Sequence, residues 1–507
     1  MAGRMELSVS LRGKGASKVV REQDDPFRVL LIADFSGRAA RPTQGAKLEL
    51  RKPRKVDAGN LDAAFAAFGA EIEVPTLRGP ERLRLSSVED LHPDQLLSNL
   101  NGFKDALATL SGLREGSSRP ELLEQARRWV GAAAAQPAAE PGTSAQASGD
   151  ASGGDTATLD RLLGRAPASA PEAQRAPAVE SVVASFLKEA VRPHLAAPSG
   201  GERDLLKAEL SRLLQDGLRS LLHSPAFRDL EAAWRGAERV IRTLDTDESL
   251  EIYVLDACYA DLVGALEAAG GDLERSALHP LFSEKAWSVV ALNERLGATD
   301  AQLTVLASLT AIVARNGGAL LADAAPGLFG VTDARSAIDP KAWAPADTSA
   351  LWHALRTSPL ATHLGLVFPP VLARLPYGKK TDEVESLSFE ELSSAEFVAS
   401  ERLWGSAAFA LLTLFGLGFR EYGWGYSHVM TPELGDLPSH TFEQDGERQL
   451  VPATEVNVIE RVAPAFLDFG VMPLIARRDR SAVRLGGLRS IAEPAAGLNG
   501  IDTSHED

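Results

Sequence analysis

Hydrophobic and polar residues alternate along the chain in patterns that predict both strands and helices. The apolar run from Phe27 to Phe35 has the length and density of a buried strand. Apolar positions recur every three or four residues over 204–224 and 226–244, which predicts two amphipathic helices. Strand-like and helix-like runs then follow one another, which is typical of an α/β domain with helices flanking a sheet.

The same reading assigns the remaining elements. Beyond residue 244, strands are expected at 250–257, 287–293, 319–325 and 363–369, helices at 259–270, 300–317 and 401–419, and a strand, short helix and hairpin over 454–487. Before residue 200, a strand is expected at Met5–Leu11, with helical segments at 56–69, 87–115, 118–133 and 180–191. The alternating residues Met5–Leu11 could form an edge strand or a strand exchanged with another copy.

A change of composition divides the chain. Residues 131–179 are dominated by alanine, proline, serine and glycine, so they cannot bury enough apolar area to offset the chain entropy. We therefore expect a disordered linker between an α/β unit at 1–130 and a second at 180–490, with a loose tail at 491–507. Inside the linker, Leu159, Leu162 and Leu163 have helical spacing, and are either a chance cluster or a short docking helix.

The helix predicted over 226–244 has a well-marked start. Ser224 and Pro225 have the residue types of an N-cap and a first turn. Phe227, Leu230 and Trp234 fall on one face, so they are expected to point into a core. On physical grounds alone, this segment is structural, and Arg228, Asp229, Glu231 and Arg235 cover its other faces.

Charge and cysteine content narrow the class of protein. The formal net charge of −16 argues against a nucleic-acid binder that works through a general basic surface. A single cysteine, Cys258, can form neither an internal disulfide nor a cysteine-based zinc site, and a small buried apolar role is expected for it. The apolar stretch Ser406–Phe419 is too short to span a membrane, and the N-terminus lacks the apolar core of a signal peptide. We therefore expect a cytoplasmic protein without membrane insertion.

Candidate chemistry is sparse. The chain has no P-loop, no GxSxG elbow and no HExxH motif, and its nine histidines are scattered. The adjacent Glu390 and Glu391 are expected on the solvated surface. We predict no catalytic residue, cofactor or metal site; an unrecognised α/β enzyme would require polar residues such as Asp256, His279, Arg374 and Tyr377 to meet in one pocket.

The segment from 221 to 241 resembles a motif of the large subunit of the type VI secretion contractile sheath, the TssC or VipB-like family. Further segments resemble later motifs of that family in the same order, over roughly 205–488. The matching framework positions are Phe227, Leu230, Glu231, Trp234, Arg235, Gly236, Arg374, Pro376, Tyr377, Gly378, Trp404 and Gly405. Pro370, Ser406 and Ala237 replace residues usual in the family.

The N-terminal unit resembles the sheath small subunit, the TssB or VipA-like family. The match rests on "PFRVLLIADFSGR", "LELRKPRKVDAGNLDAAF" and "LRLSSVEDLHPDQLLSNL", and it includes Asp34 and Gly37. The resemblance implies a small subunit fused through the linker to a large subunit. The chain stops at Asp507, whereas family large subunits continue, so we expect this large subunit to be shortened at its C-terminus.

What the resemblance implies is a non-enzymatic protein of a helical polymer that surrounds a tube of Hcp rings and contracts. The implied partners are other sheath subunits, the Hcp-like tube, baseplate proteins and a ClpV-like AAA+ unfoldase, with Leu159, Leu162 and Leu163 as the candidate unfoldase-docking helix. The alternative is a sheath-fold adaptor or baseplate-associated factor that does not polymerise.

Overall fold

The computed structural model describes residues 24–41, 51–115, 119–135, 200–344, 350–392, 398–428, 433–439, 441–444, 447–477 and 480–501, with the single residues 22 and 48. The expected strand at Met5–Leu11, the leucine island at 156–165 and the helix at 180–191 lie outside these ranges. The chain divides into two compact units, Asp105–Leu214 and a larger one that contains the rest.

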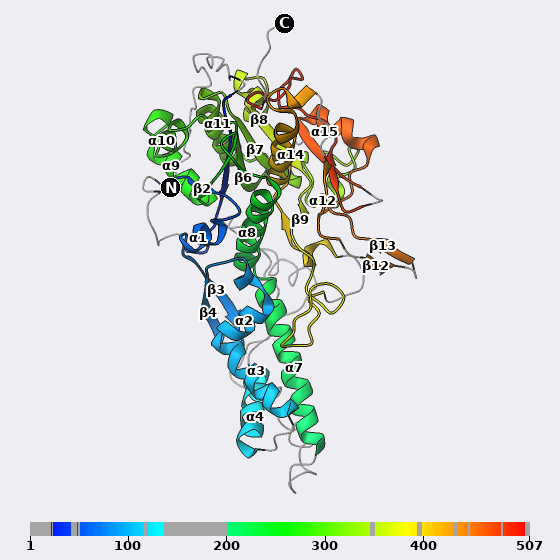
Figure 1. Cartoon of the computed structure of the whole chain (residues 1–507). Helices are drawn as coiled ribbons and strands as arrows, with labels where there is room; N and C mark the ends of the chain where they lie inside the picture. The colour runs from blue at the N-terminus through cyan, green and yellow to red at the C-terminus, as the bar shows by residue number, and fades with distance from the viewer. Residues whose placement is uncertain are drawn as a thin grey trace, which may run out of the picture. The chain divides into compact units, whose positions relative to one another are not determined.

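The larger unit is built on a mixed sheet (Figure 1). Among the described residues it has nine strands, in the order β11-β15-β14-β8-β7-β6-β1-β5-β2. The bounds are β1 Phe27–Ala33, β2 Arg54–Val56, β5 Leu250–Asp256, β6 Val289–Leu296, β7 Ala319–Ala324, β8 Leu364–Phe368, β11 Glu433–Leu434, β14 Val471–Ala476 and β15 Val483–Leu485. The six strands from β14 to β5 are parallel. At the edges, β2 pairs antiparallel with β5, β15 pairs antiparallel with β14, and β11 pairs antiparallel with β15.

Strand β1 lies inside this sheet, where it pairs in parallel with β5 on one side and β6 on the other. Its residues from Val29 to Ile32 are fully buried, as the continuous apolar run predicts for a strand covered on both faces. The strand itself is therefore confirmed, but a separate α/β unit at 1–130 is not. Residues from both ends of the chain build one sheet.

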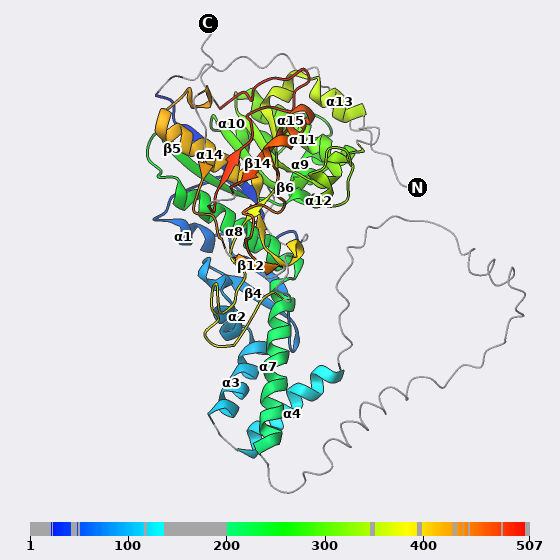
Figure 2. The same ribbon diagram turned by 90° about the vertical axis from the view of Figure 1, so that its right-hand side faces the viewer.

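Helices cover both faces of the sheet. Helix α14 (Ala407–Tyr422) crosses β1, β6, β7 and β8, and α8 (Pro225–Thr243) packs beside it. On the other face, α9 (Tyr259–Ala268), α10 (Leu278–Ser283) and α11 (Asp300–Arg315) form a core with Leu30, Ile32 and their neighbours on the strands. The view of Figure 2 shows α15 (Ala463–Phe469) close to β14, which it contacts. The predicted α/β class is confirmed.

The helical segment expected at 56–69 is present with shorter bounds, and the one expected at 87–115 is divided into a short 3-10 turn and two helices. The helices are α1 (Leu61–Ala66), α2 (Pro93–Asn99) and α3 (Asn101–Arg114). A hairpin that the sequence reading missed, β3 (Ala70–Thr76) and β4 (Gly79–Leu85), lies between α1 and α2 along the chain. The other elements are β9 Val371–Leu372, β10 Trp404–Gly405, β12 Thr441–Gln444, β13 Glu447–Leu450, α12 Ala334–Ala337 and α13 Ala350–Arg356.

The smaller unit contains the end of α3, α4 (Pro120–Ala135) and most of α7 (Gly200–Leu222). A small apolar cluster of Leu113, Leu123 and Ala126 holds it together, with Leu206 of α7 packed against the cluster. Arg127 of α4 adds an ion pair to Glu202 of α7. Helix α4 continues to Ala135, so it takes up the first residues assigned to the linker.

Two expectations near the C-terminus differ from the structure. Residues 454–459 form no strand; Thr454 makes only an isolated bridge to Val371. Residues 491–501, expected to be loose, are packed, because Ile491 and Ile501 are buried and the Asn499 amide donates a hydrogen bond to the Thr362 carbonyl. Within the described ranges, no helix combines the length and apolar character needed to cross a membrane.

Candidate functional site

Helix α8 holds several of the motif residues, and its sequence accounts for its direction of packing. Pro225 occupies its first turn, as expected, but Ser224 does not cap it through its side chain: the hydroxyl donates to the Leu221 carbonyl. Phe227, Leu230 and Trp234 are at most 2% exposed, which confirms the apolar face. Glu231, expected on another face, is 0% exposed. A buried carboxylate requires compensation from nearby donors.

The compensation comes from the segment around Arg374. The Arg374 guanidinium donates to both oxygens of Glu231, at 2.7 and 3.1 Å, and to both oxygens of Glu391, at 2.6 and 3.0 Å. Arg235 donates to Glu231 at 2.8 Å and to the Tyr377 hydroxyl at 2.8 Å. The Tyr377 amide donates to Glu391 at 2.8 Å, and its ring lies 4.2 Å from the Arg374 guanidinium carbon. We call these five residues the ionic cluster.

The charges of the ionic cluster are mutually stabilised. Burial alone would raise the pKa of the Glu391 carboxyl, but the Arg374 guanidinium, His223 and the Tyr377 amide hold it at about 2. Burial likewise opposes the charge on Arg374, yet Glu231 and Glu391 raise its pKa well above the ordinary value. Because the pKa of Glu391 is lower in the folded chain, its stabilising contribution is complete above the ordinary glutamate pKa of about 4.3. The contribution is lost as the pH falls towards 2.

Further arginines of α8 bind backbone carbonyls of the loops that lead to and from this cluster. Arg239 donates to the carbonyls of Leu372 and Ala373, at 2.9 and 2.6 Å, and burial lowers its pKa to about 10. Arg228 donates to the carbonyls of Ser400 and Arg402. The sequence analysis placed Arg228 away from the apolar face and made no prediction for Arg239, since nothing in a helical pattern identifies a distant carbonyl as the partner. They satisfy backbone carbonyls of segments that lie far from α8 along the chain.

The turn after β1 is tied to the same helix. The Trp234 indole donates to the Phe35 carbonyl at 2.8 Å, and its ring stacks on Phe65. Asp34 accepts the amides of Arg38 and Ala39, both at 2.7 Å, which closes the turn. Gly37 has a φ of +73°, and a β-carbon there would lie 2.3 Å from Ile72. These contacts explain why the turn needs an aspartate and a glycine.

The other predicted framework residues lie close to these elements. A β-carbon on Gly236 would approach Phe409 to 3.1 Å, and one on Gly378 would clash with the Glu390 carboxylate at 2.3 Å. Trp404 donates to the Ala399 carbonyl, and Gly405 pairs with Val371 across β10 and β9. Pro376 is buried next to Tyr377. The motif residues thus surround α8 as packing and hydrogen-bonding groups.

One member of the ionic cluster contradicts its prediction. Glu391 was expected on the solvated surface beside Glu390, but its side chain is 2% exposed. The signal in the sequence was the charged Arg374 inside a run of apolar and turn residues, because an arginine buried there requires a buried partner. The spacing between the two residues does not identify that partner.

The polar residues required by the enzyme hypothesis do not meet in one pocket. Asp256 accepts the Phe35 and Ser36 amides and the Ser36 hydroxyl, while Arg374 and Tyr377 belong to the ionic cluster. His279 lies on α10, within 3.5 Å of the Ser283 hydroxyl. In the described part of the chain, no three histidine, cysteine or carboxylate side chains are placed to hold a metal ion.

A hollow of about 800 Å³ lies at the carboxyl ends of β1, β5, β6 and β7. Ligands of open α/β sheets commonly bind at such an edge, where the strand order reverses. Burial and the neighbouring Asp229 raise the pKa of Glu294 in this hollow to about 7. Burial raises the pKa of the Cys258 thiol to about 11, so it stays protonated. The buried position of Cys258 confirms the expected structural role.

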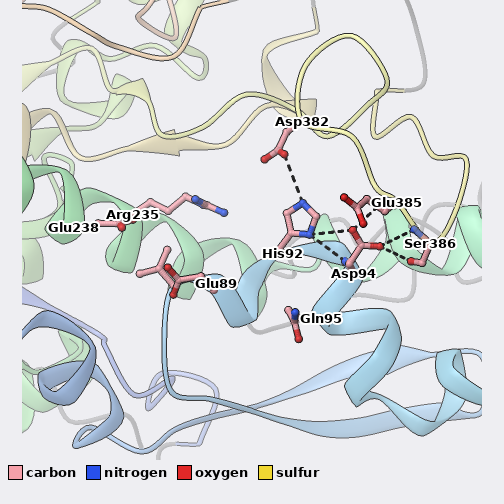
Figure 3. Close-up of a pocket in the computed structure, with 10 residues that line it drawn as sticks. Glu89, His92, Asp94, Gln95, Arg235, Glu238, Asp382, Glu385 and Ser386 are labelled. Carbon is pink, nitrogen blue, oxygen red and sulfur yellow. Dashed lines mark hydrogen bonds and ion pairs between the residues drawn. The ribbon is translucent and has the colours of Figure 1, made fainter.

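A second hollow, of about 840 Å³, is lined by α2, α8 and the loop after Tyr377 (Figure 3). His92 lies between two carboxylates: its ring nitrogens are 3.5 Å from Asp94 and 3.6 Å from Asp382. Arg235 of the ionic cluster reaches the same hollow. This hollow is therefore lined by three segments that lie far apart along the chain, at 88–95, 235–238 and 382–386.

Comparison with known proteins places these residues in a family. The model of the EvpB/VC_A0108 tail sheath N-terminal domain (VipB) matches residues 204–492, more than half of the chain. The type VI secretion system sheath protein TssC1 of Pseudomonas aeruginosa is 26% identical over 345 residues, which cover 64% of this chain and 69% of that protein. The ionic cluster lies wholly inside the matched range, and the expected resemblance to a sheath large subunit is confirmed. The chain belongs to the EvpB/VC_A0108 family of tail sheath proteins.

Proposed function

We propose that this chain is a structural component of a type VI secretion contractile sheath and that it unites both sheath subunits in one polypeptide. The position of β1 carries the proposal. Strands β5 and β6 lie in the range matched by the family model, yet they do not pair with each other, because β1 from outside that range lies between them. A sheet made from the matched residues alone would lack a strand inside it. The N-terminal segment supplies that strand, as a bound small subunit would.

The roles of the two parts of the chain follow from the position of β1. Residues 1–130 take the role of the small subunit, and residues 180–490 take that of the large subunit. The segment at 131–179 acts as the tether between them, with 491–507 as the end of the large-subunit part. A tether keeps the two parts at a high effective concentration and fixes their ratio at one to one. Arg51 adds to the association, since it donates to both oxygens of Asp261, at 2.8 and 3.0 Å.

The working cycle we propose needs no catalytic residue. Copies of the chain assemble in the cytoplasm around an Hcp-like tube, on a baseplate, in an extended lattice. Contraction propels the tube when the copies repack into a second lattice with more favourable contacts. Strand exchange through residues such as Met5–Leu11 ties neighbouring copies together while the rigid sheets move.

Electron microscopy of negatively stained protein tests this function. The purified chain, alone or with an Hcp-like tube protein, is expected to form rings or tubes, because sheath function requires heterologous contacts that repeat. Light scattering measures the size of the assemblies in solution under the same two conditions. A chain that stays monomeric under both conditions would overturn the polymer and leave the adaptor or baseplate-associated function as the better account.

A second proposal concerns disassembly by a ClpV-like AAA+ unfoldase, whose docking site we assign to the leucine island. Replacing Leu159, Leu162 and Leu163 with serine is expected to reduce unfoldase capture at least tenfold, because an amphipathic docking helix binds through its apolar face. A pull-down with the unfoldase as bait measures this. Serine replacement of the neighbouring Thr156 and Thr158 is the control and should leave capture unchanged; equal capture of the leucine variant would refute the assignment.

A further inference from the structure

In the larger unit, the loop at residues 379–390 closes on itself at the ionic cluster. The Tyr377 amide donates to the Glu391 carboxylate at 2.8 Å, and the Glu391 amide donates to the Tyr377 carbonyl at 2.9 Å. Loops whose ends meet in this way form compact surface units that are frequently functional. Both residues at the base belong to the ionic cluster, so the conformation of the loop and the geometry of the cluster are linked.

We divide the 379–390 loop before Leu387 and call residues 379–386 its first half and 387–390 its second half, because the two are held differently. In the second half, Leu387 and Phe389 are at most 4% exposed, so apolar packing fixes them. In the first half, Lys379, Lys380 and Asp382 are exposed. Val384 is the buried apolar side chain of that half. The first half therefore depends more on polar contacts for its position.

Some of these contacts are made within the loop, where the Gly378 amide donates to the Asp382 carbonyl at 2.8 Å, and the others come from the N-terminal segment. Asp94, in the first turn of α2, accepts the Glu385 amide at 3.0 Å and the Ser386 amide at 2.9 Å, and it also accepts the Ser386 hydroxyl (Figure 3). Glu385 and Ser386 follow Asp94 by 291 and 292 residues along the chain. One carboxylate thus satisfies two amides that have no helix or strand to bind them.

Charge makes these hydrogen bonds stronger than neutral ones. Burial would raise the pKa of Asp94, but the donors from Ser386 and Glu385 lower it below the ordinary value. The carboxylate is therefore ionised at neutral pH. His92 adds no hydrogen bond to this half of the loop, since its Nε2 atom is 3.6 Å from the Asp382 carboxylate.

We propose that Asp94 acts as a latch: it orders the first half of the 379–390 loop only while the N-terminal segment that carries α2 is packed against the rest of the larger unit. With the latch closed, the loop lies against α2 and covers one side of the 840 Å³ hollow. With the latch open, the loop keeps its apolar anchor but loses its fixed first half. The latch links α2 to a loop that begins and ends at the ionic cluster. The proposal does not depend on what the chain assembles into.

Hydrogen exchange on the full chain tests the latch. In Asp94→Ala, the amides of Glu385 and Ser386 are expected to exchange roughly 10-fold faster or more, because a charged hydrogen-bond acceptor has been removed. Trypsin cleavage at Lys379 and Lys380 should accelerate in parallel. Ser386→Ala removes one of the three donors and should give a smaller acceleration of the Glu385 amide.

Asp382→Asn is the matched control, since it removes a carboxylate from the same hollow without touching the two amides. It is expected to leave their exchange unchanged. Unchanged exchange in Asp94→Ala would overturn the proposal. An equal loss of protection at Val29–Ile32 of β1 would overturn it as well, because Asp94 would then hold the fold together instead of latching one loop.

Discussion

Replacing Leu31 with aspartate is expected to prevent the larger unit from folding. Leu31 is 0% exposed in a strand that is paired on both sides, so the new carboxylate would be buried without a partner. Several kcal/mol are lost when an ionised group is buried in this way, against a total stability of about 5–15 kcal/mol for a folded domain. Loss of soluble protein, or of a cooperative transition in circular dichroism, measures the effect.

Leu205→Asp is the matched control for this prediction. The chemical change is the same, but Leu205 lies on α7 and is 74% exposed. Surface substitutions usually change stability by about 0.5 kcal/mol or less. A Leu31→Asp chain that melts like the Leu205→Asp chain would show that β1 is not part of the sheet, and the proposed fusion of two subunits would lose its main support.

Arg374→Ala is expected to cost about 3–5 kcal/mol of unfolding free energy, since it leaves Glu231 and Glu391 buried without their shared cation. Denaturant unfolding at pH 7 measures the loss. Combining Arg374→Ala with Glu231→Gln and Glu391→Gln should recover part of it, because the neutral amides have less charge to compensate. Recovery is therefore a more specific signature of the ionic cluster than the loss alone.

Arg242→Ala provides the comparison on the same helix. Arg242 pairs with Glu238 at 2.8 Å, but its side chain is 53% exposed, so the pair contributes about 0–1 kcal/mol. If Arg374→Ala costs no more than Arg242→Ala, the ionic cluster does not stabilise the fold and its residues need another explanation.

Local sequence patterns were enough to predict individual strands and helices. The apolar run at Phe27–Phe35 predicts a strand, and the 3.6-residue period predicts α8, because both signals are contained in a few neighbouring residues. Neither signal identifies a neighbour in the sheet. The position of β1 between β5 and β6 depends on pairings with residues more than 200 positions away, which no periodicity encodes.

The hairpin β3–β4 was missed for a different reason. Ile72, Val74, Leu83 and Leu85 are buried and alternate with polar residues, which is the pattern of a half-buried strand. Pro75 and Pro80, which lie beside the turn, weaken the strand signal. Glu391 was misplaced because a glutamate is normally exposed, and the arginine that makes its burial favourable comes from a turn that no helical or strand period connects to it.

The interior position of β1 has a consequence for synthesis of the chain. Its contacts to β5 and β6 span 223 and 260 residues, as the Arg28–Glu251 and Arg28–Ser288 pairs measure. At about 5–20 residues per second, the ribosome needs roughly 10–50 s to deliver those partners after β1 has been made. During that interval an apolar strand with two open edges is exposed to every other nascent chain. Folding of each new chain is therefore delayed until β5 and β6 have been made. Until then β1 needs protection, for instance by a chaperone.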